Sequence, residues 1–446
     1  MPLGAKMKGL KTLGSLCSGI EVASLVFNPL GVRTLWMSEI ADFPSRLLAE
    51  RFPGVPNLGD MARIAGLIDR GEVEAPDIIC GGTPCQAFSM AGWRNGTDDD
   101  RGRLTLKYID IIDAADRQRR SRGLGPAIFL WENVEGVLTD KTNAFGCFLA
   151  GLLGAEKPLE ARKWPSAGIV RGKGRNVAWR VLDAKYFGVP QQRRRVYLLG
   201  GGSDFAPWEV LFERCGMIAD PLKARKSRTP SLFDEEVMVV APAAQSLVKE
   251  VGGHRVEAFR SYTDCLYAAY GTKWNGNAAA FNGSLFLSQD GRLRRLTPLE
   301  CERLMGLPDN YTLLPGCRDT QRYRAVGNSW AVPVVGWLAR RLLGGACGGE
   351  ELDIAARAAT GGENGLAMLR DFTPCGAGRY VNASAYPADY RLASVTDIAD
   401  PDAAEKFYIS ARGCAGILRR KREHNAGMPP RLEEVLESCS EGLACA

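Results

Sequence analysis

The sequence predicts an α/β protein with a doubly wound, mostly parallel sheet, a smaller loop-rich domain and a C-terminal extension. Short apolar runs alternate with stretches of helical periodicity over residues 10–200, which is the pattern of strand–helix–strand units. Over residues 201–290 this periodicity fades, and Gly, Asn, Ser and Arg become frequent. The 446 residues, 46% of them apolar, suffice for two or three domains. We therefore divide the chain into segments 1–200, 201–290, 291–345 and 346–446, the third returning to the first domain.

Five strands and three helices are expected in the first segment. The strand candidates are apolar runs at residues 10–17, 32–39, 75–80, 126–133 and 194–200. The helix candidates, with apolar residues at helical spacing, are residues 23–30, 43–52 and 103–118. Ligands of doubly wound sheets bind beyond the carboxyl ends of the strands. Residues that directly follow a strand candidate are therefore candidate site residues.

Helices are expected again after the loop-rich segment. Thr297 is placed to cap a helix in which Pro298 occupies the first turn and Glu300 completes a capping box. A second helix is expected over residues 329–343. In the extension, whose role the sequence does not reveal, Ser410 is expected to cap a helix that ends in a basic cluster.

Composition excludes several kinds of protein and of chemistry. The chain has neither a run of ~18 apolar residues nor a signal-peptide pattern, so we expect a cytoplasmic protein. Its 13 cysteines include no CxxC pair, so neither a disulfide framework nor a metal site is expected. Only two histidines are present, which disfavours a histidine base. The net charge of +6 slightly favours an acidic partner such as nucleic acid.

The motif GGTPCQAFS, residues 81–89, directly follows an apolar strand candidate. Pro84 restricts the backbone on both sides, so Cys85 is presented on a stiff loop. A free thiol is only a few per cent thiolate at pH 7, so a nucleophilic role requires nearby positive charge. On its own the motif favours a structural cysteine in a turn, and the interpretation as a nucleophile depends on the sites that follow.

A second polar pair follows the next strand candidate, where Glu132 and Asn133 stand in the motif WENVEGV. Because parallel strands end at one edge of a sheet, the Glu132 carboxyl group is expected near Cys85. The alternative interpretation is an acidic residue at a helix N-terminus.

A run of arginines leads into the fifth strand candidate. Alternation along that strand would send Arg193 and Arg195 to one face and Arg194 to the other. Two guanidinium groups on one face are suited to a phosphate or a base carbonyl. The alternative is a solvated surface.

In this order the motifs resemble those of the DNA cytosine-5 methyltransferases. The resemblance covers roughly residues 10–345 and rests on SLCSGIEVA (15–23), GGTPCQAFS (81–89), ENV (132–134), QQRRR (191–195), RRLTPLECERLMGLPDNY (294–311) and GNSWAVPVV (327–335). It implies the Rossmann-like fold of S-adenosylmethionine-dependent methyltransferases. It also implies methyl transfer from S-adenosylmethionine to C5 of a flipped-out cytosine, with S-adenosylhomocysteine as product.

The resemblance assigns roles by position. Cys85 matches the nucleophile that adds to C6, Glu132 the carboxyl group at N3, and Arg195 and Arg193 the arginines of the site. For Glu132 this role requires a raised pKa in the closed pocket. The expected substrate contacts are Gln86, Asn133, Gln191, Lys273, Trp274 and Asn275. The expected cofactor contacts are Ser18, Gly19, Ile20, Glu39, Asp60, Pro84, Leu104, Asn328 and Ser329.

Two residues depart from the family pattern in the cofactor motif. Cys17 stands where the family usually has Phe, and Glu21 stands where it usually has a second Gly. We expect these departures to affect the affinity for S-adenosylmethionine most.

The resemblance also implies partners. We expect a monomer that binds duplex DNA through residues 201–290, with the C-terminal tail similar to those of phage or prophage methyltransferases. The enzyme could act with a cognate restriction endonuclease or as an orphan methyltransferase, and the sequence leaves both alternatives open. Two alternatives remain, namely the same chemistry on transfer RNA and a catalytically silent relative that only binds nucleic acid.

Overall fold

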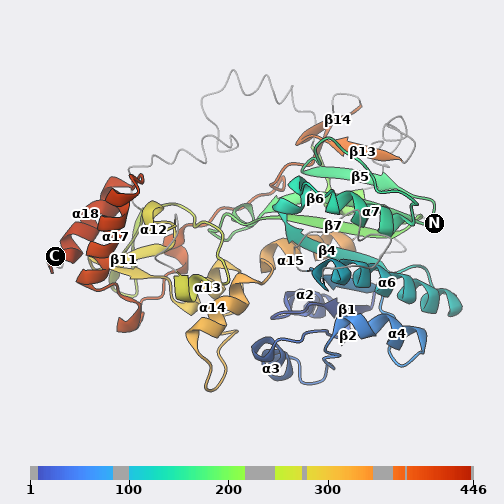
Figure 1. The fold of residues 1–446 in the computed structure, drawn as a ribbon, viewed down its shortest axis with the longest axis horizontal. Helices are drawn as coiled ribbons and strands as arrows, with labels where there is room; N and C mark the ends of the chain where they lie inside the picture. Colours follow the sequence, from blue (N-terminus) through green and yellow to red (C-terminus); the bar gives the residue numbers. More distant parts are fainter. Residues whose placement is uncertain are drawn as a thin grey trace. The chain divides into compact units, whose positions relative to one another are not determined.

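The computed structural model describes residues 9–83, 100–215, 247–273, 279–344, 365–376 and 379–442 (Figure 1). These residues divide into two compact units. The first comprises residues 1–183, 194–219 and 334–389, and the second comprises residues 184–193, 220–333 and 390–446. Helix α15 (Val332–Gly344) starts in the second unit and continues into the first. Each unit is described by itself.

The first unit contains an eight-stranded sheet in the order β13-β5-β6-β7-β4-β3-β1-β2. Its strands are β1 (Thr12–Leu16), β2 (Arg33–Trp36), β3 (Ile78–Gly81), β4 (Ile128–Val134), β5 (Ala167–Arg171), β6 (Arg175–Asp183), β7 (Arg194–Gly202) and β13 (Leu366–Leu369). All five strands expected from the sequence are present, and the α/β fold class is confirmed.

Parallel pairing is confined to the half of the sheet formed by β1 to β4. The other half is antiparallel, and within it residues 172–174 join β5 to β6 by a hairpin instead of a helical crossover. The expected mostly parallel sheet is therefore a mixed sheet. The chain runs from β1 to β2 on one side and then to β3 on the other side of β1. The carboxyl ends of β1 and β3 thus flank the switch point where ligands bind in such sheets.

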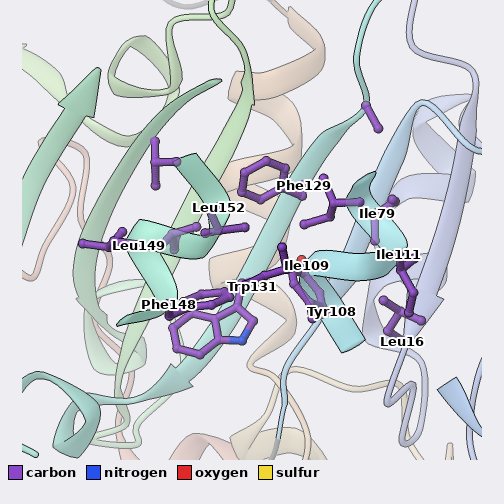
Figure 2. Packing of buried hydrophobic residues seen from close by; sticks show 14 of the residues in the cluster. Leu16, Ile79, Tyr108, Ile109, Ile111, Phe129, Trp131, Phe148, Leu149 and Leu152 are labelled. Carbon is purple, nitrogen blue, oxygen red and sulfur yellow. The ribbon is translucent and has the colours of Figure 1, made fainter. Parts of the chain in front are cut away.

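Helices cover the sheet of the first unit. They are α2 (Val22–Phe27), α3 (Asp42–Arg51), α4 (Ile64–Asp69), α6 (Asp100–Ser121), α7 (Ala144–Leu153) and α8 (Pro207–Leu211). Apolar residues of α4, α6 and α7 belong to one buried cluster that also contains alternate residues of β4 and β6. Figure 2 shows the part around Phe129 and Trp131 of β4, with Tyr108 of α6 and Phe148 of α7 against them.

The C-terminal part of the chain also contributes to the first unit. Strand β13 pairs with β5 as an edge strand of the large sheet. A small sheet joins β14 (Phe372–Gly376) and β15 (Arg379–Asn382) to β8 (Glu213–Cys215). The fully buried Arg180 guanidinium donates to the carbonyls of Ser384, Tyr386 and Leu211 at 2.6 to 2.8 Å. These contacts bind the extension to the core of the sheet.

The second unit is built on an antiparallel sheet in the order β12-β11-β10-β9. Its strands are β9 (Leu247–Val251), β10 (His254–Ala258), β11 (Phe286–Gln289) and β12 (Arg292–Arg295). The helical hairpin of α17 (Ala411–Glu423) and α18 (Pro430–Ser440) buries Ile417, Leu432 and Val435 in one cluster with Phe286 and Leu293 of this sheet. The extension therefore completes the core of this unit as well.

The expected helix caps of the second unit are confirmed. The remaining helices of this unit are α11 (Tyr270–Lys273), α12 (Ala279–Asn282), α13 (Pro298–Leu304) and α14 (Asp319–Gly327). Thr297 caps α13, with Pro298 in the first turn and Glu300 completing the capping box. The Ser410 hydroxyl accepts from Gly413 N–H at the start of α17, whose last turn is basic.

Candidate functional site

Two parallel strands carry the expected nucleophile loop and acid motif. Gly81, the last residue of β3, pairs with Trp131 of β4, so Thr83 lies beyond β3 near the level of Asn133. The Asn133 Nδ2 donates to the Thr83 carbonyl at 3.0 Å, and both residues are buried. The acid motif therefore holds the backbone two residues before Cys85. Pro84, Cys85 and Gln86 themselves lie outside the described residues.

Glu132 and Arg195 form an ion pair on one face of the sheet. In the antiparallel pairing of β4 with β7, Glu132 lies opposite Tyr197 and Val134 lies opposite Arg195. Glu132 and Arg195 are therefore diagonal neighbours. The Arg195 Nε lies 3.2 Å from the Glu132 Oε1, and these side chains are 14% and 10% exposed. The structure brings these two expected site residues together in a largely desolvated place.

The expected pairing of Arg193 with Arg195 on one strand face is wrong. Strand β7 starts at Arg194, so Arg193 lies outside the strand and its alternation. The Arg193 guanidinium, 3% exposed, donates to the carbonyls of Ser329 at 2.6 Å and Gly327 at 3.1 Å in the second unit. Arg194 instead pairs with Glu135 at 2.7 Å.

Gln191 is fully buried in the second unit. Its Nε2 donates to the Leu304 carbonyl at 3.0 Å, and its Oε1 accepts from Leu266 N–H at 3.0 Å. The packing leaves no room for a side chain at Gly327, because an added Cβ would lie 2.7 Å from the Ala268 nitrogen. Together with Arg193, Gln191 connects the arginine motif with the last motif of the chain. The expected contact of Gln191 with substrate stays a prediction.

The cofactor motif forms a tight turn between β1 and α2. Cys17, Gly19 and Glu21 all have positive φ, at 49°, 53° and 62°. Ser18 connects this turn to the end of β2, because its N–H donates to the Ser38 carbonyl at 2.9 Å and its Oγ accepts from Ser38 N–H at 3.0 Å. Alternating left-handed residues turn the chain sharply beyond the carboxyl end of β1.

Glu39 is held at this turn by backbone amides. Its Oε2 accepts from Gly19 N–H at 2.8 Å, and its Oε1 accepts from Ala41 N–H at 2.7 Å. Asn57, a residue that sequence reasoning missed, fixes the Glu39 backbone through hydrogen bonds of 2.9 and 3.0 Å. The structure therefore brings the expected residues Gly19 and Glu39 together.

Besides burial, the carboxyl groups of Glu39 and Asp60 both raise the pKa of the Cys17 thiol. Burial, together with these two negative charges, raises the pKa of the Cys17 thiol to about 12. This thiol is therefore neutral at pH 7 and has no nucleophilic character. Asp60 is exposed and caps the next turn, with its Oδ1 accepting from Ala62 N–H at 2.9 Å.

The residues around the turn fit an adenosine-containing cofactor. Glu39 and Asp60 offer acceptors for hydroxyl and amine groups, and Ile40, which sequence reasoning also missed, is 79% exposed beside Glu39 and offers an apolar surface. Among the residues that the structure describes, a Cβ on Gly19 would have only the Cys17 carbonyl within 4 Å, so these residues leave the space in front of this glycine open.

Glu21 explains how a residue other than glycine fits the turn. Its left-handed backbone conformation, at φ 62°, costs roughly 1–2 kcal/mol for an L-residue. Its buried Oε1 accepts from both the N–H and the Oγ of Ser24 at 2.8 Å, which caps α2. The cap offsets the strain that the family's usual glycine avoids.

The remaining expected residues are spread over both units. Leu104 packs against the apolar cluster of the first unit, and Ile20 is buried there. Lys273 is exposed at the end of α11, and Asn328 is exposed at the end of α14, beside the buried Ser329. Trp274 and Asn275 lie outside the described residues. The cofactor and substrate contacts of these residues stay predictions.

Neither a metal cluster nor a membrane helix is found where the chain is described. Among those residues, no group of three or more His, Cys, Asp or Glu side chains is placed to hold a metal ion. Within the same ranges, no helix combines the length and apolarity that crossing a bilayer requires.

The fold and the ordered motifs define a methyltransferase of the Rossmann-like α/β class, and comparison with known families gives the particular one. Residues 12–155 and 170–344 match the family described as C-5 cytosine-specific DNA methylase. The chain belongs to this family, whose members are DNA cytosine-5 methyltransferases.

Relatives in phages and restriction–modification systems are similar to this chain. The type II methyltransferase M1.ScrFI of Lactococcus lactis subsp. cremoris is 30% identical over 70% of this chain and 72% of its own length. A DNA N-6-adenine-methyltransferase of Escherichia phage P1 is 34% identical over 75% of this chain, and the match spans only 61% of that protein. Among solved structures, a DNMT2 variant of Spodoptera frugiperda is 20% identical, covering 74% of this chain and 99% of its own, with a TM-score of 0.45.

Proposed function

We propose that this protein transfers a methyl group from S-adenosylmethionine to C5 of a cytosine extruded from duplex DNA, through a covalent bond between Cys85 and C6. The observation that carries the proposal is the ion pair between Glu132 of β4 and Arg195 of β7, next to β3, the strand that leads to Cys85. Family membership supplies the reaction class. The roles of individual residues are the finer part of the proposal.

The chemistry requires a nucleophile because C5 of cytosine is not reactive by itself. Addition of the Cys85 thiolate to C6, with a proton delivered to N3, makes C5 electron-rich. After methyl transfer, loss of the C5 proton, expulsion of the thiolate and return of the N3 proton to Glu132 restore the aromatic ring. This covalent route divides one difficult step into several easier ones.

Glu132 and Arg195 are suited to bind the pyrimidine edge. In this proposal the Glu132 carboxyl group meets N3 and the exocyclic amine, and the Arg195 guanidinium meets the carbonyl oxygen. Their ion pair orients both groups before the base arrives, so less ordering is needed on binding. The flipped base leaves the stack at a cost of a few kcal/mol, which contacts of this kind recover.

Glu39, Asp60, Gly19 and Ile40 are the residues proposed to hold the cofactor. When bound there, S-adenosylmethionine supplies an activated methyl group. Glu39 would accept from ribose hydroxyls and Asp60 from the adenine amine, while Ile40 would cover the ring. Asn328 and Ser329, expected from the sequence as further cofactor contacts, stay predictions.

The second unit is proposed to read the DNA target. Residues 201–290 contain its β9–β10 hairpin and the exposed Lys273 of α11. Lys273, Trp274 and Asn275 carry groups suited to base edges or to the space that the extruded base vacates.

The first experiment measures transfer of label from S-adenosylmethionine to duplex DNA and to transfer RNA. Label on DNA that disappears in Cys85→Ala is expected. Label on transfer RNA alone would reject the DNA substrate, and label on neither would favour the silent alternative. Bisulfite sequencing of DNA from a methylation-free host that expresses the protein then identifies the target.

The phage P1 relative requires a second readout, because its name specifies transfer to N6 of adenine. An exocyclic amine has its own lone pair and needs no thiol, so the Cys85 chemistry argues for C5. Mass spectrometry of the nucleosides should show 5-methyl-2′-deoxycytidine. N6-methyl-2′-deoxyadenosine in its place would contradict the proposal.

A further inference from the structure

A junction of four buried or half-buried residues connects the acid strand to both ends of the segment that carries Cys85. It comprises Thr83 after β3, Thr105 on α6, and Trp131 and Asn133 on β4. We call it the Thr83 junction. Thr83 precedes residues 84–99 and Thr105 follows them, so the junction joins the chain on either side of that segment.

Three hydrogen bonds meet at Thr83, which is 4% exposed. Its Oγ1 accepts from the Trp131 Nε1 at 3.1 Å and lies 3.1 Å from the Thr105 Oγ1, so these hydroxyls share a hydrogen bond. Its carbonyl accepts from the Asn133 Nδ2 at 3.0 Å. The hydroxyl and the carbonyl of one residue are therefore both held by β4.

Trp131 cannot readily turn its N–H elsewhere. The indole is 2% exposed and packs on Phe148 of α7, with ring centroids 4.7 Å apart (Figure 2). An indole N–H without a partner in such a place costs roughly 1–3 kcal/mol, which favours the arrangement with Thr83.

The junction borders Glu132 on both sides. Trp131 and Asn133 share one face of β4 because side chains alternate along a strand, and Glu132 takes the other face. The same peptide segment thus positions the carboxyl group and anchors the backbone two residues before Cys85. Catalytic groups need placement within about 0.5 Å, and an error of about 1 Å can cost roughly 10²-fold in rate.

We propose that Thr83 is a positioning residue for the methyl transfer: through Trp131 and Thr105 its hydroxyl fixes the backbone two residues before Cys85 relative to Glu132. The inference rests on the proposed function, because it assumes that Cys85 attacks cytosine. Thr83 itself touches neither base nor cofactor in this scheme.

The test measures the single-turnover rate of adduct formation with duplex DNA that contains 5-fluorocytosine in the identified target. Thr83→Val, which keeps the shape and removes the hydroxyl, should slow this step by at least ~10-fold. Thr83→Ser, which keeps the hydroxyl, should stay within ~3-fold of wild type. The dissociation constants for DNA and for S-adenosylhomocysteine should change less than ~3-fold, so kcat falls while KM does not.

Two further variants keep the inference testable if Thr83→Val folds poorly. Trp131→Phe removes the N–H that donates to Thr83, and Thr105→Val removes the second hydroxyl. Each of these variants should slow adduct formation by itself, and unchanged rates in both would overturn the inference. Where Thr83→Val folds, adding Trp131→Phe should slow adduct formation no further, since both substitutions remove one interaction.

The matched control is Thr396→Val in the second unit. Thr396 is also buried, and its hydroxyl pairs with the Ser394 Oγ at 2.9 Å, outside every candidate site. An adduct rate in Thr83→Val equal to that of wild type, or an equal slowing in Thr396→Val, would overturn the inference alone. An active wild type that forms no adduct, or one whose adduct survives in Cys85→Ala, would overturn the proposed function as well.

Discussion

The Glu132 carboxylate lies 3.2 Å from the Arg195 guanidinium as its diagonal neighbour across β4 and β7. Because the two side chains share one sheet face, a change of one residue in the register of β7 would send Arg195 to the opposite face. The hydrogen bonds of the sheet therefore determine the spacing of the proposed base-binding pair.

Glu132→Gln should reduce kcat/KM at least ~10²-fold, because an amide cannot deliver the proton that N3 requires. Glu135→Gln is the matched control, since Glu135 pairs with Arg194 near the end of the same strand. Steady-state methylation of target DNA checks both variants. Activity of Glu132→Gln near that of wild type would exclude Glu132 as the proton donor.

Glu21→Gln should stabilise the protein more at high pH than at low pH. Burial raises the pKa of the Glu21 carboxyl group, although the hydroxyls of Ser15, Ser24 and Ser18 and the Ser24 N–H oppose this effect. The folded protein thus binds this proton more tightly than the unfolded chain, and stability is lost as pH rises above the unfolded pKa of ~4.3.

Urea unfolding between ~pH 5 and ~pH 8 tests this expectation. The unfolding free energy of Glu21→Gln minus that of wild type should increase across the range. Glu50→Gln, at an exposed position on α3, provides the control. A difference that is constant or decreasing would mean that Glu21 remains charged in the folded protein.

Arg180→Met should lower the free energy of unfolding by roughly 3–5 kcal/mol, because it leaves buried acceptors of the small sheet and the extension without a donor. Arg117→Met removes an ion pair to Asp69 that is about half exposed and should cost less than ~1 kcal/mol. Chemical denaturation gives both values. Equal effects of the two substitutions would argue against the binding of residues 384–386 through Arg180.

Gly327→Ala should destabilise the protein by roughly 1–3 kcal/mol, since the added Cβ meets the backbone of Ala268. Gly344→Ala, at the end of α15 with none of the described residues within 4 Å of the added Cβ, is the control and should be neutral or slightly stabilising. Thermal unfolding compares the two variants. A neutral Gly327→Ala would show that the backbone around Arg193 adapts.

Much of the fold could be predicted because the local sequence patterns, such as apolar runs and helix caps, agree with the elements that form. The five expected strands form, and the capping residues Thr297 and Ser410 act as expected. The hairpin of β5 and β6 was missed, although the GKG at residues 172–174 between alternating apolar residues is a turn signal. The pairing of Leu366 with Val170 has no local signal, because the two residues are far apart in the sequence.

Only the site residues that stand in recognisable sequence motifs could be predicted. These motifs identified Glu132, Arg195, Gly19 and Glu39, which the structure places in contact as two pairs. The predicted strand began at residue 194, as β7 does, but extending its alternation back to Arg193 placed this side chain on the face of Arg195, whereas it donates to the carbonyls of Gly327 and Ser329. The Thr83 junction depends on side-chain orientation across two strands and a helix, which no spacing in one sequence encodes.

The late edge strand β13 has a consequence for biosynthesis. Strand β5 leaves the ribosome long before residues 366–369 are made, so its outer edge lacks a partner for most of translation. An open strand edge invites pairing with other chains. Nascent molecules that terminate early would therefore be the aggregation-prone population, and the last quarter of the polypeptide protects against this self-association.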